Sequence, residues 1–148
     1  MPTTKIFASA ATRMSIADIV AAGTHALYGG TRARFAAVIA SRLGRADAIA
    51  LSSLMRNTFA VVRAVQHLKP RASVILPRYS CPSFIHGIHA AGIPFVYCDI
   101  DPATLSVTPE LVERVRTNAC GALLVPNLFG LAADMDSLEK YCAEHGLL

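Results

Sequence analysis

The stretch SVILPRYSCPSFIHGIHAAGIPFVYC, residues 73–98, decides the fold. It opens with an apolar run at 73–76 that is rich in β-branched residues, stops at a proline and predicts a buried strand. Residues 82–91 predict a helix that ends at Gly92, and the apolar run at 95–98 predicts a second strand. A strand, a helix and a strand in this order predict a parallel β-α-β unit.

The alternation begins before this stretch. The short apolar run at 48–51 predicts another buried strand. Residues 57–68 then predict a helix whose apolar residues Phe59, Val62 and Val65 face the core. Together with residues 73–98 they predict an α/β domain in which helices cover a parallel sheet.

The alternation also continues to the last residue. Thr108 predicts the N-cap of a helix that ends near Thr117, and the run at 122–125 predicts a further strand. Asp136 and Glu139 have the spacing of a capping box for a last helix.

Gly146 predicts the end of that helix, and Leu147 and Leu148 begin what should be another strand. The last predicted helix therefore has no complete strand to return to, since a parallel sheet alternates helices with strands. We expect the 148 residues to be the first part of a larger domain.

The first 31 residues are less regular, and we predict an N-terminal arm at 1–31 followed by one domain at 32–148. Ser15 predicts the cap of a helix that ends at Gly23, and two glycines at 29–30 predict a hinge before the next helix. Two interpretations stay open for the arm: it packs across a partner subunit, or it has no fixed structure.

Composition excludes several classes of function. The chain is 53% hydrophobic with a mean hydropathy of +0.44, but its apolar runs are too short to span a bilayer, so they indicate a buried sheet. The net charge of +4 is spread along the chain without a basic stripe, which does not favour nucleic-acid binding. Four cysteines without metal-ligand spacing predict reduced thiols of a cytoplasmic protein and no metal site.

Ligands of an open parallel sheet bind at the carboxyl ends of its strands. The loop at 52–56 follows a predicted strand and opens a helix, so its free N–H groups and the helix dipole favour a phosphate. Ser52, Ser53 and Arg56 add possible donors, although an ordinary helix cap explains them equally well. Cys81 lies near a second helix N-terminus, where a packed, inert thiol is the simpler interpretation.

Four segments of the sequence together resemble the DegT/DnrJ/StrS family. The segments are VILPRYSCPS at 74–83, AGIPFVYCDIDPATL at 91–105, LVPNLFG at 124–130 and ADMDSL at 133–138. Members of this family are pyridoxal-phosphate enzymes that mostly aminate keto-sugars. The resemblance implies a three-layer α/β sandwich, namely part of an aspartate-aminotransferase-like (fold type I) large domain with a mostly parallel sheet.

The resemblance also implies a cofactor site for pyridoxal 5'-phosphate. Ser53, Leu54, Met55 and Arg56 match the phosphate-binding segment, although Leu54 and Met55 replace the small residues that let a backbone approach a phosphate. Cys81 matches the position where many members place an aromatic residue over the cofactor ring. Stacking by Tyr79 is a further possibility that its position does not support.

Further implications concern the intact protein. The resemblance implies a nucleotide-linked keto-sugar as substrate, an amino-acid donor and a homodimer. It places the aspartate that pairs with the pyridine nitrogen and the Schiff-base lysine beyond Leu148, so we assign no catalytic residue and expect the isolated chain to be inactive. The alternative is a non-catalytic member of the fold with a binding or regulatory role.

Overall fold

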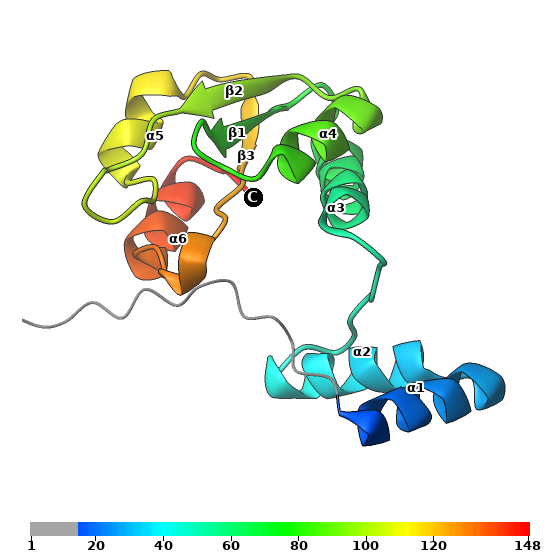
Figure 1. Cartoon of the computed structure of the whole chain (residues 1–148). Coiled ribbons are helices and arrows are strands. Elements are labelled where there is room, and N and C mark those ends of the chain that lie inside the picture. The colour runs from blue at the N-terminus through cyan, green and yellow to red at the C-terminus, as the bar shows by residue number, and fades with distance from the viewer. Residues whose placement is uncertain (1–14) are drawn as a thin grey trace, which may run out of the picture. The chain divides into compact units, whose positions relative to one another are not determined.

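The computed structural model describes residues 15–148, and the chain divides into two compact units after Ala50. The first unit contains helices α1 (Ile16–Tyr28) and α2 (Thr31–Arg42). The second contains α3 (Leu54–Leu68), β1 (Ser73–Pro77), α4 (Pro82–Ala91), β2 (Phe95–Cys98), α5 (Pro109–Val115), β3 (Cys120–Leu123), the 3-10 turn η1 (Leu128–Gly130) and α6 (Met135–Glu144), as Figure 1 shows. The division into an arm at 1–31 and a domain at 32–148 stays a prediction, and residues 1–14 of that arm lie outside the described residues.

The predicted cap and hinge of the first unit are confirmed, but the helix between them is longer than predicted. Ser15 and Asp18 form a capping box at the start of α1. The helix continues through Gly23 and ends at Gly29, because a glycine that does not need a positive φ is tolerated inside a helix. Gly29 and Gly30 have φ values of 69° and 78°, which break the chain between α1 and α2.

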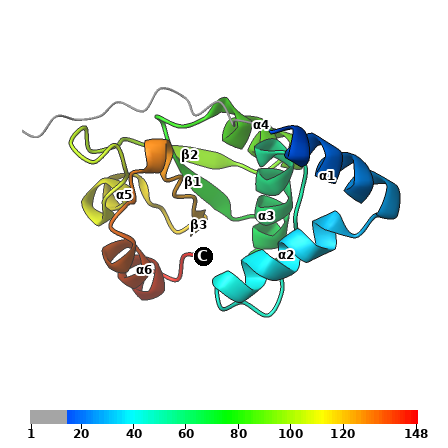
Figure 2. The same ribbon diagram turned by 60° about the horizontal axis from the view of Figure 1, so that its bottom comes forward.

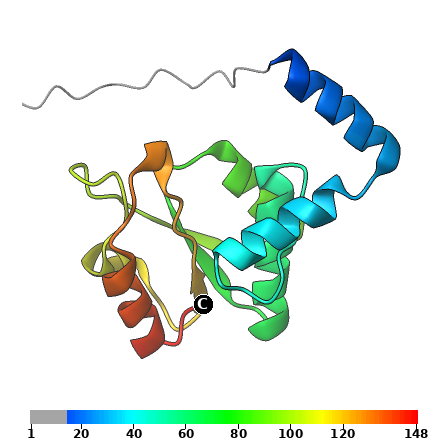
Figure 3. The same ribbon diagram turned by 90° about the horizontal axis from the view of Figure 1, so that it is seen from below.

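Three parallel strands form the sheet of the second unit, in the order β2-β1-β3. The strand β3 begins at Cys120 rather than at Ala122, since its pairing with β1 already starts at Ser73. Leu148 lies beside β3, where its N–H donates to Gly121 O at 3.0 Å and its carbonyl accepts from Leu123 N at 3.0 Å. This is the start of a parallel pairing on the outer edge of β3, as predicted, and Figure 3 shows the C-terminus there.

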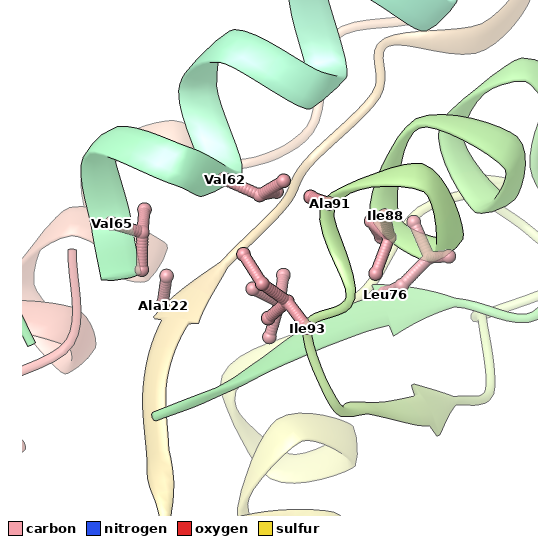
Figure 4. Packing of buried hydrophobic residues seen from close by; sticks show 8 residues of the cluster. Val62, Val65, Leu76, Ile88, Ala91, Ile93 and Ala122 are labelled. Carbon is pink, nitrogen blue, oxygen red and sulfur yellow. The ribbon is translucent and has the colours of Figure 1, made fainter. Parts of the chain in front are cut away.

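The sheet has helices on both faces, which makes three layers (Figures 1 and 2). Side chains alternate along β1, so Val74 and Leu76 pack beneath α3 and α4 while Ile75 packs toward α5 and α6. All three are at most 1% exposed. Figure 4 shows the first of these clusters, with Val62 and Ile88 pointing from the two helices toward the sheet.

Two predictions about the apolar residues before β1 are wrong. Residues 48–51 form no strand, and Ile49 is 82% exposed, because an apolar run becomes a strand only where a neighbouring strand pairs with it. Val62 and Val65 are buried in α3 as predicted, but Phe59 is 41% exposed. The packing of α4 on α3 decides which stripe of α3 is buried, and Phe59 lies at its margin.

Helix boundaries in the second unit follow the capping residues. Thr108 caps α5 by accepting a hydrogen bond from Leu111 N, as predicted. The capping box predicted at Asp136 and Glu139 is wrong, since Asp134 caps α6 and accepts from Ser137 N at 3.2 Å. The two aspartates are only two residues apart at the start of the same helix, so both positions are plausible caps from the sequence alone.

Helices α5 and α6 are joined by a three-residue polar network. Arg116 Nε donates to Glu113 Oε2 and to Tyr141 Oη, both at 3.0 Å, and Tyr141 Oη donates to Glu113. The Arg116 guanidinium, followed by the Tyr141 hydroxyl, lowers the pKa of Glu113 to about 2. The carboxylate of Glu113 is thus favoured in the folded state.

We expect Glu113→Gln to lower the Tm at pH 7. The folded-state pKa lies below the ordinary value of 4.5, so the stabilisation is fully present above pH 4.5 and is lost as the pH falls toward 2. The Tm difference between the two proteins should therefore shrink over that interval in thermal melts. Glu144→Gln, at the exposed end of α6, is the control, and an equal pH dependence for both variants would contradict the role of the network.

Candidate functional site

The first turn of α3 presents hydrogen-bond donors next to the sheet. Ser53 is the N-cap in an extended conformation, and its Oγ accepts from Arg56 N at 3.3 Å. The first N–H groups of a helix have no partner inside the helix, so those of Leu54 and Met55 stay available to a ligand. The hydroxyl of Ser53 can still donate its own proton.

The electrostatics of this turn favour an anion. The first turn of α3 has no acidic residue, and Arg56 forms no ion pair with any of residues 15–148. The helix dipole adds partial positive charge at the same end. Leu54 and Met55 are 40% and 42% exposed, so this end of the helix stays in contact with solvent.

The loop after β1 carries the other two predicted residues. Tyr79 is 51% exposed, and Cys81 is the N-cap of α4 with Pro82 at the first helical position. Hydrogen bonding to Ser83 lowers the pKa of the Cys81 thiol. Cys81 is a free thiol, and its side chain is only partly buried.

Ser80, between these two residues, was not predicted as a site residue. Its Oγ is buried and has no hydrogen-bond partner among the residues that the structure describes. A buried hydroxyl without a partner costs about 1–3 kcal/mol, so it is compensated where a ligand supplies the bond. The position after a strand drew attention to this loop, but only the three-dimensional structure shows that the hydroxyl is unpaired.

Gly87, in the middle of α4, lies directly against α3, and it too was not predicted as a site residue. A Cβ at Gly87 would lie 2.7 Å from Met55 O, 2.7 Å from Thr58 Cβ and 3.1 Å from Phe59 N. The first two turns of α3 thus pack directly on the backbone of α4. A glycine in the middle of a predicted helix was the one signal that the sequence offered.

The loops after β2 and β3 complete this edge of the sheet. Asp99 pairs with Arg78 at 3.5 Å, and Asp101 holds a turn by accepting from Ala103 N at 2.9 Å. A cavity of about 470 Å³ lies between the starts of α5 and α6 and includes none of the six predicted residues. Its residues Thr108 and Asp134 already serve as helix caps.

Residues 15–148 contain no group of three or more His, Cys, Asp or Glu side chains that could hold a metal ion. In the same part of the chain, no helix is long and apolar enough to cross a membrane. All four cysteines are free thiols.

An open parallel sheet covered by helices, with the N-terminus of α3 and the loop after β1 at its carboxyl edge, places the chain among the α/β proteins that bind ligands at that edge. Residues 9–148 match the DegT/DnrJ/EryC1/StrS aminotransferase family. The chain belongs to this family, as predicted from its motifs.

Three curated relatives illustrate the range of this family. The chain is 43% identical over 65 residues to L-glutamine:2-deoxy-scyllo-inosose aminotransferase of Streptomyces fradiae, covering 44% of this chain and 15% of the relative. It is 32% identical over 136 residues to dTDP-4-dehydro-2,3,6-trideoxy-D-glucose 4-aminotransferase of Saccharopolyspora spinosa, and this match covers 90% of this chain and 35% of the relative. A pleiotropic regulatory protein of Geobacillus stearothermophilus is 32% identical over 79 residues, and this match covers 53% of this chain and 21% of the relative. The chain thus spans about a third or less of these relatives.

Solved structures confirm the fold. The aminotransferase from Psychrobacter cryohalolentis superimposes with a TM-score of 0.83 at 21% identity, over 92% of this chain and 36% of that one. NtdA from Bacillus subtilis, solved with bound cofactor PMP, superimposes with a TM-score of 0.79 at 25% identity, over 89% of this chain and 32% of that one. The prediction of a partial fold type I aminotransferase domain with a parallel sheet is therefore confirmed.

Proposed function

We propose that the complete gene product transfers an amino group to the carbonyl of a cyclic keto-sugar with pyridoxal 5'-phosphate as cofactor. Bound pyridoxal phosphate supplies an electron sink for this chemistry. The observation that carries the proposal is the first turn of α3, where Ser53, two free N–H groups and unpaired Arg56 meet at the carboxyl edge of a sheet in an aminotransferase family.

The donors of this turn fit a phosphate group. Ser53 contributes its hydroxyl, Leu54 and Met55 contribute backbone N–H groups, and Arg56 contributes a guanidinium that suits phosphate oxygens. The side chains of Leu54 and Met55 do not alter the backbone donors. Glycine is therefore not required for the charge complementarity of the site, although close approach is more restricted.

The loop after β1 would hold the ring of the cofactor. The polarizable sulfur of the partly buried Cys81 can pack against a π face. The unpaired Ser80 hydroxyl offers a hydrogen bond to a polar group. Gly87 keeps this loop close to the phosphate-binding turn.

We infer that residues 15–148 bind and orient the cofactor but do not provide the catalytic lysine. The Nζ of Lys69 donates to the Gly146 carbonyl, and Lys140 is exposed on α6. Neither lies at the carboxyl edge of the sheet. The isolated 148-residue chain is accordingly expected to bind without turnover.

The relatives support two substrate types, a nucleotide-linked keto-sugar and a free cyclic ketone, with an amino acid as donor. We further propose a cytoplasmic homodimer. Support for assembly comes from α1, where Ile16 and Leu27 are 81% and 83% exposed although the helix is apolar on most of its surface.

The second candidate is a non-catalytic binding or regulatory protein. The similarity to a regulatory protein and the bulky, exposed Leu54 and Met55 favour it. The two candidates differ in one assay: the complete gene product with pyridoxal phosphate, L-glutamine or L-glutamate, and each of the two ketones named by the relatives. Formation of the amine from either ketone supports the enzyme, whereas cofactor binding without transfer to either ketone supports the regulatory role.

We expect Arg56→Ala to weaken binding of pyridoxal phosphate roughly 10- to 100-fold, since a charge-assisted hydrogen bond contributes about 1.5–3 kcal/mol. Equilibrium dialysis of the complete gene product measures this. Arg63→Ala is the matched control, because Arg63 is exposed on the same helix and donates to Gln66. Equal affinities of the two variants would remove Arg56 from the phosphate site.

A further inference from the structure

Phe129 stands out in the loop after β3. It is 76% exposed, and its backbone has φ 56° and ψ 17°. A bulky residue in this left-handed region is strained by about 1–3 kcal/mol, and burial of the ring returns none of that cost here. The structure thus places a large aromatic ring in solvent at an energetic cost.

The loop that carries Phe129 is a built structure. Asn127 Oδ1 accepts from Ala133 N at 3.1 Å, and Leu131 N donates to Leu128 O at 2.9 Å. Gly130 follows with φ 78°, which reverses the chain. These bonds hold Phe129 in its exposed position, and the NH₂ group of the exposed Asn127 side chain has no hydrogen-bond partner among residues 15–148.

Tyr79 is the aromatic neighbour of Phe129. The ring centroids are 6.5 Å apart, and the planes are inclined by 39°. The two residues follow β1 and β3, which are adjacent strands of the sheet, so both lie at the carboxyl edge. Tyr79 is half exposed as well, so the pair presents two open faces rather than a closed contact.

We propose that Phe129 and Tyr79 form the wall against which the ring of the keto-sugar packs, with the Asn127 NH₂ group as donor to a ring hydroxyl. The proposal rests on the proposed function and names the substrate-contacting residues of the same site. Aromatic faces suit the C–H faces of a saturated ring, and a nearby amide suits its hydroxyls. The strained backbone fixes the Phe129 ring before the substrate binds, so the ring loses little conformational entropy on binding.

The test uses the complete gene product loaded with pyridoxal phosphate and three variants. Phe129→Gly removes the ring and relieves the strained φ, Phe129→Tyr keeps the ring, and Tyr79→Leu removes the second face. KM and kcat are measured for 2-deoxy-scyllo-inosose and for dTDP-4-dehydro-2,3,6-trideoxy-D-glucose, with Tm and cofactor affinity alongside. Saturation-transfer NMR of the same two ketones reports binding independently of turnover.

We expect Phe129→Gly to raise the KM of the accepted ketone roughly 3- to 10-fold, as the loss of an aromatic contact predicts, while its Tm rises and cofactor affinity is unchanged. Tyr79→Leu should raise KM similarly, and Phe129→Tyr should stay within about twofold of the parent. A purely structural role would lower the Tm and leave KM unchanged.

The outcomes separate the two proposals. Turnover by the parent with an unchanged KM in Phe129→Gly overturns the aromatic wall alone, as does a loss of cofactor affinity in place of a change in KM. Binding without turnover overturns the enzymatic function, and the NMR signals of the Phe129→Gly protein then decide the wall. A parent that neither binds nor aminates either ketone overturns both.

Discussion

Replacing Gly87 by alanine is expected to lower the free energy of unfolding by about 1–3 kcal/mol and to weaken binding of pyridoxal phosphate at the same time. The added Cβ would lie 2.7 Å from Met55 O, a backbone atom that cannot rotate away. Helix α3 must therefore shift relative to α4. The turn at Ser53, where we propose that the phosphate binds, then moves with α3.

Urea unfolding and equilibrium dialysis measure the two effects, and Gly23→Ala is the matched control. Gly23 also lies inside a helix, but nothing lies within 4 Å of an added Cβ there. Since alanine is the better helix former, this variant should be stabilised by about 0.5–1 kcal/mol. A Gly87→Ala protein that behaves like the control would show that the contact between α3 and α4 is not tight.

Replacing Ile75 by alanine is expected to cost about 2–5 kcal/mol, the largest loss of stability among these predictions. Ile75 is fully buried in β1, the central strand, where it packs with Val112 and Leu138 from α5 and α6. Truncation leaves a cavity between the sheet and both helices, and the closely packed neighbours cannot fill it.

Ile49→Ala is the control for this prediction, because Ile49 is 82% exposed and belongs to the other compact unit. We expect its effect to stay within about 0.5 kcal/mol. Urea unfolding at one pH compares the two variants. A cost below about 1 kcal/mol for Ile75→Ala would contradict the assignment of this residue to the core.

The site was only partly predictable from the sequence. Ser53 and Arg56 lie at a helix N-terminus as predicted, because a capping serine before an apolar helix is a local signal. Ser80 was not identified, since an unpaired hydroxyl is a property of its surroundings. The exposed position of Phe129 was not predicted either, because its exposure and its neighbour Tyr79 depend on how β1 and β3 pair.

The sequence by itself determined which segments of the second unit become helices and strands. Thr108, Gly92 and the alternation of apolar runs act over a few residues, so capping and chain reversal can be read locally. Tertiary structure alone decided the rest. Residues 48–51 form no strand because no neighbouring strand pairs with them, and Phe59 in α3 is only partly covered. Gly87 sets how closely α3 approaches α4. Each of these three outcomes depends on residues that are distant in the chain.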